Sequence, residues 1–198
     1  MAGKVQERRK ALRESLTLIA QRHIAQNGLG ALRARDLAKE AGCALGAIYN
    51  VFGDLTDLVL EVNARTFKQL GADVAEALAS ADQTPLDQLT TMGQAYAHFA
   101  ADHHHLWRAL FDVDRPDGET APDWYLAEMG RLLAYIDAPL RVAFRDMSDV
   151  ERDLFTRTLF SSVHGIVLLG LENASAGVPT GQVDQMIALL LKRLVPAE

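Results

Sequence analysis

Residues 32–58 read LRARDLAKEAGCALGAIYNVFGDLTDL, and this stretch predicts two short amphipathic helices that meet at one glycine. Apolar residues recur at helical spacing in both halves: Leu37, Ala38 and Ala41, then Ala44, Ile48 and Phe52. Gly42 fits the left-handed conformation that ends many helices, and the small Cys43 can fill the corner behind it. The pattern is that of a helix-turn-helix, with a further helix after Gly53.

The composition indicates an all-α protein. Of the 198 residues, 49% are hydrophobic, which is enough for a buried core, whereas glycine and proline are sparse and alternating strand patterns are almost absent. The single cysteine excludes an internal disulfide and a cysteine-only zinc site. Because we find no signal-peptide pattern and no long charge-free apolar run, we expect a cytoplasmic protein that does not enter a membrane.

Charge is divided unevenly along the chain. The net charge is −6, yet residues 1–53 contain nine Lys and Arg against four acids and carry +5, so the remainder carries −11. A basic segment on an acidic body is typical of a module that contacts phosphates while the rest of the protein is repelled by them. Solvated helix faces would give the same totals, but the overlap with the helix-turn-helix pattern favours nucleic acid.

The whole chain predicts about nine helices in two domains. Outside the motif, helical spacing and start signals place helices over 5–26, 54–81, from 85 onward, within 102–111, and over 124–144, 148–173 and 178–194. The eighth opens with a capping box, Ser148-Asp149-Val150-Glu151. We predict a helix-turn-helix domain at 1–53 and a second domain at 54–198, joined by a continuous helix that would transmit movement.

Residues 9–60 resemble the N-terminal DNA-binding domain of the TetR family of transcriptional regulators. The residues that carry this resemblance are Gly28, Leu37-Ala38, Ala41-Gly42, Gly46, Ile48-Tyr49, Phe52 and Leu58. The later chain is similar to the WHG type of C-terminal ligand-binding domain, through Tyr96-Ala97-His98-Phe99, His105-Leu106-Trp107-Arg108, Leu110-Phe111 and Val163-His164-Gly165. The resemblance implies a three-helix DNA-binding head followed by a helical ligand-binding and dimerisation body.

The head departs from the family pattern at two kinds of position. Arg33 or Ala34 and Ala44 stand where the family often has Ser or Thr helix caps, and each missing cap costs about 1 kcal/mol locally. Leu45 and Leu55 replace basic residues that are frequent in the family. Each lost phosphate contact lowers the salt dependence of DNA binding by a slope of about 0.9, so we expect weaker binding.

The second helix of the motif is the predicted recognition helix. Its outward residues, together with flanking candidates for phosphate contact, form the predicted DNA-binding set: Arg33, Arg35, Leu45, Gly46, Ala47, Tyr49, Asn50 and Thr56. Asn50 can pair with adenine, and Leu45 and Ala47 can touch thymine methyl groups. Tyr49 resembles the family's phosphate-contacting tyrosine. A solvated helix face, or surface ion pairs of Arg33 and Arg35, is the alternative interpretation.

Aromatic residues on four predicted helices of the body suggest an apolar cavity with a few polar groups. The predicted effector-binding residues are Tyr96, Phe99, Trp107, Phe111, Trp124 and His164, with Met129 beside them. Aromatic residues at helical spacing also fill ordinary cores, and for any single residue that alternative stays open. The family resemblance, rather than composition, favours a small organic ligand.

The last two predicted helices are apolar on more than one face, which predicts burial on two sides. A four-helix interface with a second copy would cover the excess, and we expect it to use Phe160, Val163, Val167, Leu171, Met186 and Leu190. Closure of the monomer core by both helices is the alternative. A homodimer would place two recognition helices on a palindromic operator.

The histidines support a competing interpretation. His98 and His103, His104 and His105 could form a transition-metal site, giving a metal-binding protein or metal-responsive regulator. Consecutive helical side chains point about 100° apart, so at most two of the triplet converge, and no HExxH pattern occurs. We therefore expect no metal, no cofactor and no enzyme activity, and favour a repressor that a small apolar or amphipathic ligand releases from double-stranded DNA.

Overall fold

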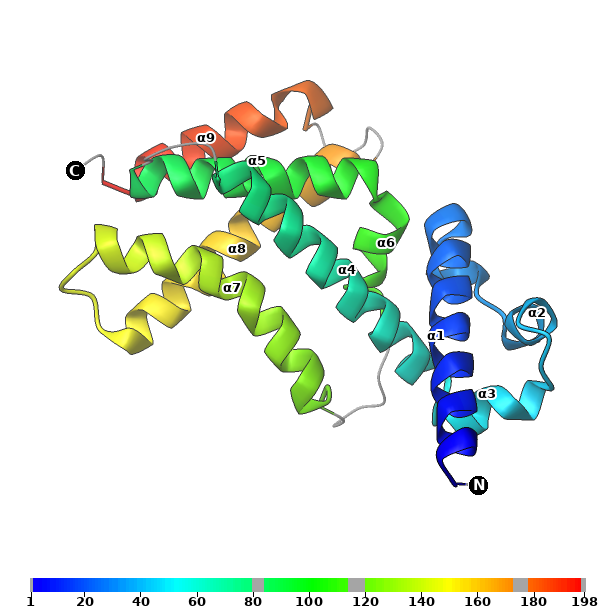
Figure 1. Cartoon of the computed structure of the whole chain (residues 1–198). Coiled ribbons are helices and arrows are strands. Elements are labelled where there is room, and N and C mark those ends of the chain that lie inside the picture. Colours follow the sequence, from blue (N-terminus) through cyan, green and yellow to red (C-terminus); the bar gives the residue numbers. More distant parts are fainter. Residues whose placement is uncertain (1, 80–83, 114–119, 173–177, 197–198) are drawn as a thin grey trace. The chain divides into compact units, whose positions relative to one another are not determined.

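The computed structural model describes residues 2–79, 84–113, 120–172 and 178–196, and every regular element within these ranges is helical (Figure 1). The elements in order are α1 (Ala2–Asn27), η1 (Leu29–Ala31), α2 (Ala34–Glu40), α3 (Leu45–Val51), α4 (Leu55–Leu78), α5 (Pro85–Asp102), α6 (His104–Ala109), α7 (Asp123–Ala143), α8 (Asp149–Leu171), η2 (Thr180–Gln182) and α9 (Val183–Leu194). The predicted all-α fold is confirmed, with nine α-helices among the residues that the structure describes.

Three helices begin with the capping chemistry that the sequence predicts. The Ser148 hydroxyl accepts a hydrogen bond from the Glu151 N–H, and the Glu151 carboxylate accepts one from the Ser148 N–H, so the capping box is complete. Hydrogen bonds from the Ser148 hydroxyl and, to a lesser extent, from the Ser148 N–H to the Glu151 carboxylate hold the pKa of Glu151 below its ordinary value. Asp54 and Thr84 accept in the same way at the starts of α4 and α5.

Packing divides the chain into two compact units. The first unit comprises Met1–Phe67 and His103–Tyr125, and the second comprises Lys68–Asp102 and Leu126–Glu198. Helix α4 contributes residues to both units, and α6 belongs with the helix-turn-helix segment. The functional division after residue 53 remains a prediction, because these units describe packing only.

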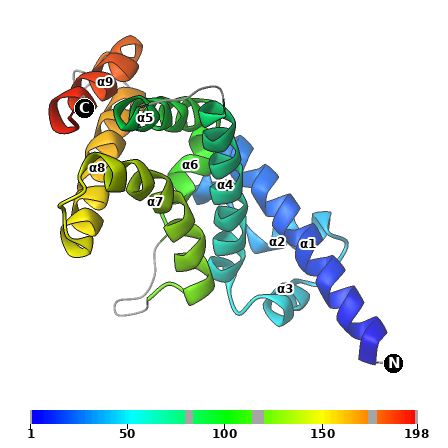
Figure 2. The same cartoon turned by 60° about the vertical axis from the view of Figure 1, so that its left-hand side comes forward.

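The first unit has one apolar core that fixes the position of α3. Ile48 and Phe52 are buried with residues of α1, α2, α4 and α6: Leu16, Ile24, Leu37, Leu58 and Leu106. The Arg13 guanidinium lies 4.5 Å from the Phe52 ring centre and donates a hydrogen bond to the Val51 carbonyl at 2.9 Å. Arg13 also pairs with Glu61 of α4, so one side chain connects α1, α3 and α4. Figure 2 shows the ribbons of these three helices.

The second unit packs α5, α8 and α9 closely around small residues. A Cβ atom at Gly93 would overlap the Ile187 side chain, and one at Gly170 would overlap Val183. Helix α9 can therefore approach α5 and α8 only because these two positions lack side chains. Between α7 and α8, the buried Arg152 donates a 2.9 Å hydrogen bond to Asp137.

Candidate DNA-binding surface and effector-binding residues

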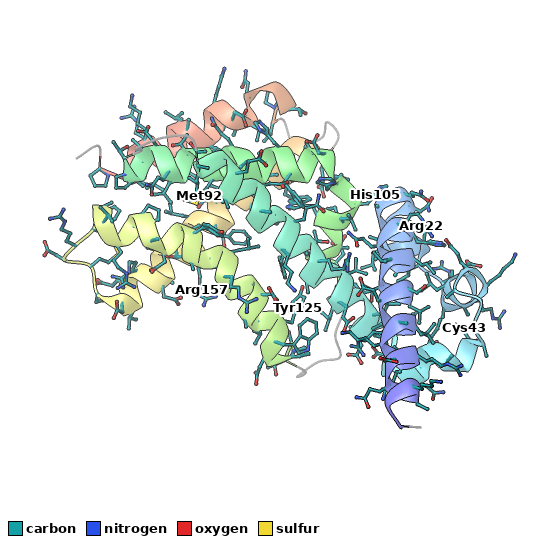
Figure 3. All side chains as sticks on the ribbon, in the orientation of Figure 1. Arg22, Cys43, Met92, His105, Tyr125 and Arg157 are labelled. Atoms are coloured by element: carbon teal, nitrogen blue, oxygen red, sulfur yellow. The ribbon has the colours of Figure 1, made fainter. Side chains whose placement is uncertain are left out.

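The turn between α2 and α3 has the predicted geometry. Gly42 has φ of 65°, in the left-handed region, and the Cys43 N–H donates to the Ala38 carbonyl at 3.0 Å, closing the end of α2. Cys43 is half-buried and packs against the core of the first unit (Figure 3). The sequence therefore predicted both the glycine that reverses the chain and the thiol that fills the corner.

Neither helix of the motif has a side-chain cap. The residues before α2 and α3, Arg33 and Ala44, make no capping hydrogen bond, as predicted. The Nη1 group of Arg33 instead donates to the Gly30 and Leu32 carbonyls at 2.8 and 2.9 Å. A phosphate contact by Arg33 would therefore use the rest of its guanidinium group.

The outer face of α3 is open to solvent. Leu45, Gly46, Tyr49 and Asn50 are exposed and Ala47 is half-buried, whereas Ile48 lies in the core. The five members of the predicted set that lie in α3 are therefore accessible to solvent, Ala47 only in part. Val51 is also buried, although the sequence interpretation had not assigned it to the core.

The other predicted phosphate contacts lie on either side of this helix. Arg35 is exposed in the first turn of α2, and Thr56 is half-buried in the first turn of α4. Two further basic residues of the head are committed to carboxylates within the chain, since Arg13 pairs with Glu61 and Arg22 pairs with Glu40. Glu61 lies outside residues 1–53, so its pairing with Arg13 leaves the head less positive than the +5 of the charge count.

Hydrogen bonds at Glu40 tie α1 to the end of α2. A hydrogen bond of 2.7 Å joins His23 Nε2 and Glu40 Oε2, and Arg22 contacts the other carboxylate oxygen. The hydrogen bond from His23, assisted by Arg22, lowers the pKa of Glu40 below its ordinary value. The contact anchors the C-terminal end of α2, close to the turn.

In the second unit, the structure brings together Tyr96 of α5 and His164 of α8. A hydrogen bond of 2.7 Å joins the Tyr96 hydroxyl and His164 Nδ1. Phe160 stacks on the His164 ring at 5.8 Å and meets the Tyr96 ring edge-on at 5.9 Å. The three residues form a cluster in which aromatic rings surround one polar hydrogen bond. Phe160, which we predicted for a dimer interface, contributes one of these rings.

The other predicted effector residues differ in exposure. In the first unit, Trp107 is fully buried and meets the exposed Phe111 edge-on at 5.7 Å. Trp124, also in the first unit, is exposed at the start of α7. In the second unit Phe99 is buried on α5. Core filling therefore accounts for the burial of Phe99 and Trp107, and their contact with a ligand stays a prediction.

A groove of about 390 Å³ lies between η1 and α6, and its lining includes His105, one of the candidates of the metal interpretation. It is lined by Gly28, Leu29, Gly30, His105, Arg108, Ala109 and Asp112. His105 Nδ1 donates to the Ala25 carbonyl at 3.0 Å, and Gly28 has a φ of 77° that lets the chain leave α1. The sequence signals here were Gly28, which carries part of the family resemblance, and His105.

Sequence reasoning also missed a buried polar cluster in the first unit. Asn63 of α4 donates through Nδ2 to the Ala109 carbonyl at 2.8 Å, and its side chain lies beside the Tyr125 hydroxyl. Burial raises the pKa of Tyr125, and the neighbouring Asn63 amide partly offsets this effect. The one available signal was an asparagine within the apolar run of α4.

The histidines do not assemble into a metal site in the part of the chain that the structure describes. His98 Nε2 donates to Asp184 at 3.0 Å within the second unit, whereas His103, His104 and His105 belong to the first unit. Across the described ranges, no group of three His, Cys, Asp or Glu side chains could hold a metal ion. The competing metal interpretation gains no support from these residues.

Solved structures share this fold along nearly the whole chain. A protein of unknown function from Rhodococcus sp. RHA1 matches with a TM-score of 0.73 and 22% identity, over 93% of this chain and 95% of that one. RolR in complex with resorcinol matches with a TM-score of 0.72 and 19% identity, over 98% and 91%. FadR from Bacillus subtilis in complex with stearoyl-CoA gives 0.65 and 17%, over 90% and 96%.

A match to a family profile identifies the family, whereas these structural matches show the fold alone. The profile described as "Tetracyclin repressor-like, C-terminal domain" matches residues 89–194, which is more than half of the chain. A comparison with curated proteins gave no match. With its all-helical fold and its helix-turn-helix segment, the chain belongs to the TetR family of transcriptional regulators.

Proposed function

We propose that this regulator is a homodimeric repressor that binds a palindromic operator and is released by a small apolar or amphipathic ligand. The observation that carries the proposal is the open face of α3, held by a buried core beneath it and preceded by an ordered turn. In a helix-turn-helix, that face enters the major groove. We propose a cytoplasmic, non-enzymatic protein, consistent with this role.

The proposed DNA contacts divide by chemistry. Asn50 reads adenine through its amide, while Leu45 and Ala47 touch thymine methyl groups. Tyr49 contacts a phosphate through its hydroxyl. Arg33, Arg35, Gly46 and Thr56 complete the set, the arginines and the threonine through phosphates and the glycine through close backbone approach.

Apolar side chains of α8 and α9 support a homodimer. Leu169 and Leu194 are exposed, and the side chain of Leu189 is 57% exposed. Of the predicted interface residues, Leu171, Met186 and Leu190 are half-buried, so a second copy can still cover them. Val163 and Val167 are already buried within one chain, so their side chains are not available to a partner.

Helix α8 is the one described helix that is long and apolar enough to cross a membrane, and 28% of its apolar window is buried within the chain. Polar groups interrupt that surface, however. Arg157 pairs with Asp153 on the same helix, and the Ser162 hydroxyl donates to the Thr158 carbonyl. A mixed surface of this kind fits a protein interface better than lipid, which supports the second copy.

The proposed effector site includes the Tyr96, His164 and Phe160 group of the second unit. Fold relatives have been solved with resorcinol and with stearoyl-CoA, which have aromatic and acyl bodies respectively. An apolar or amphipathic ligand is therefore the class we propose for this chain. Ligand binding would shift α4 and weaken operator binding, and such couplings are typically worth about 1 to 3 kcal/mol.

Binding to the DNA that lies upstream of the protein's own gene tests the proposal. Fluorescence anisotropy with genomic fragments should show binding that Asn50→Ala weakens by about tenfold and Tyr49→Phe weakens less, in a salt-dependent manner. Glu76→Ala, an exposed change on α4 in the second unit, serves as the matched control and should bind like the parent. Equal binding by the two head variants and the parent would exclude the proposed DNA contact.

A further inference from the structure

We propose that Asn63 is a ligand-binding residue, whose side-chain oxygen accepts a hydrogen bond from a neutral ligand that carries a hydroxyl or N–H on an apolar body. The site lies entirely within the first compact unit, between α4, the end of α6 and the start of α7. The inference rests on the proposed function only in treating this ligand as an effector.

The orientation of the Asn63 amide is fixed by the protein. The side chain is 0% exposed, and its Nδ2 group donates to the Ala109 carbonyl at 2.8 Å. Rotating the amide by 180° would place two carbonyl oxygens against each other, so the nitrogen must face Ala109. The side-chain oxygen Oδ1 consequently points away from α6.

That oxygen has no hydrogen-bond donor. Among the described residues, neither a side chain nor a backbone N–H reaches Asn63 Oδ1, although the atom is buried. Buried carbonyl oxygens in folded proteins almost always receive at least one hydrogen bond, since an unmet one keeps its full desolvation cost. A bound ligand or an ordered water molecule can meet this need.

The surroundings favour a ligand with an aromatic or apolar body. The Phe67 and Tyr125 rings lie 5.4 Å apart at a tilt of 53°, both in the first unit, and Tyr125 is only 7% exposed. Trp124 packs edge-on against Tyr125, with ring centres 5.8 Å apart, and is itself exposed. The buried Tyr125 ring therefore contacts a ring that solvent reaches. An apolar body can pack on these rings while its polar group reaches the amide.

The same geometry selects against anionic ligands. A carboxylate offers only acceptor oxygens, which would oppose Asn63 Oδ1 instead of bonding to it. Burial raises the pKa of Tyr125, so its hydroxyl stays neutral beside the amide and adds no charge. A phenol, an alcohol or an amide N–H meets the acceptor without carrying charge into the core.

The site is connected to the helix-turn-helix segment within the first unit. Asn63 bonds to Ala109, the last residue of α6, and His105 of the same helix donates to the Ala25 carbonyl near the end of α1. A ligand that bonds to the Asn63 amide is therefore connected to α1 through two hydrogen bonds, Asn63 to Ala109 and His105 to Ala25.

A matched pair of probes tests this assignment. In calorimetric titrations, 4-propylphenol should bind the parent protein about tenfold more tightly than 4-propylanisole, which has the same body without the donor. Asn63→Leu should reduce this ratio to about one. Thr156→Val, which removes a buried unpartnered hydroxyl in the second unit, is the control and should keep the ratio.

The outcomes separate this inference from the proposed function. The assignment would be overturned if the parent bound the two probes with equal affinity, as expected if only water bonds to Asn63. It would also be overturned if the affinity ratio were unchanged in Asn63→Leu. If Asn63→Leu does not fold, the parent's ratio and a phenol-dependent shift of the Asn63 side-chain NMR signals decide. DNA binding is measured separately. A preference for the phenol without DNA binding supports the ligand site and rejects the proposed repressor function. DNA binding without a preference for the phenol rejects the ligand site alone.

Discussion

Helices α3 and α8 are stabilised in opposite ways. Helix α3 has seven residues and no side-chain cap at Ala44, and it is held by what packs beneath it. Helix α8 has 23 residues and opens with a complete capping box at Ser148. A helix of seven residues is not stable alone. The helix that would read DNA therefore depends on its neighbours, whereas the helix that would face a second copy carries its own start signal.

The largest effect should come from removing the support beneath α3. Phe52→Ala leaves a cavity and deletes the ring under the Arg13 guanidinium, so we expect a loss of about 3 to 5 kcal/mol in the free energy of unfolding. Urea unfolding followed by circular dichroism measures it. A loss below 1 kcal/mol would mean that α3 does not depend on this core.

The turn before α3 should give the next largest effect. Gly42→Ala places a side chain at a φ of 65°, which costs about 1 to 2 kcal/mol. Gly46→Ala, within α3 where an added Cβ meets nothing within 4 Å, is the matched control and should stabilise by about 0.5 to 1 kcal/mol. Thermal unfolding of the two variants compares them, and equal changes would show that backbone conformation at Gly42 is unimportant.

Exchanging caps between the two helices sharpens the contrast directly. Ser148→Ala removes the capping box of α8 and should cost about 1 kcal/mol, while Ala44→Ser supplies α3 with a cap and should return a similar amount. The second change should also tighten DNA binding, because it orders the recognition helix. A stabilised Ala44→Ser protein with weaker DNA binding would contradict this view and imply that α3 must adjust on DNA.

The smallest effect concerns pH. The pKa of Glu40 is lowered in the folded protein, so its contribution to stability is present above its ordinary pKa of 4.5 and is lost as pH falls through the lower, folded value. The stability difference between the parent and Glu40→Gln should therefore shrink between about pH 5 and pH 3. Urea midpoints across this range measure it. A difference that grows in acid would reverse the assigned sign.

The sequence was informative where local chemistry decides structure. Gly42, the capping box at Ser148 and the uncapped start at Ala44 were all predicted correctly, because each depends on a few adjacent residues. The exposed face of α3 also followed from spacing alone. Whether these residues contact DNA remains a prediction.

The sequence was uninformative where distant segments meet. Asn63 is buried because the end of α6, 46 residues later, covers it, and no local pattern encodes that contact. Val163 and Val167 lie on a helix that is apolar nearly all round, so spacing cannot say which face turns inward. In the folded chain Val163 is buried and lies beside Gly93 of α5, where Ile187 of α9 also packs.

The half-buried Cys43 gives the protein an internal reporter. It is the only cysteine in the chain, and its thiol packs in the corner between α2 and α3. A thiol-reactive dye would therefore label one atom, at a rate set by how often this corner opens. Labelling with and without DNA or ligand would time the local opening of the head, with no engineered label required.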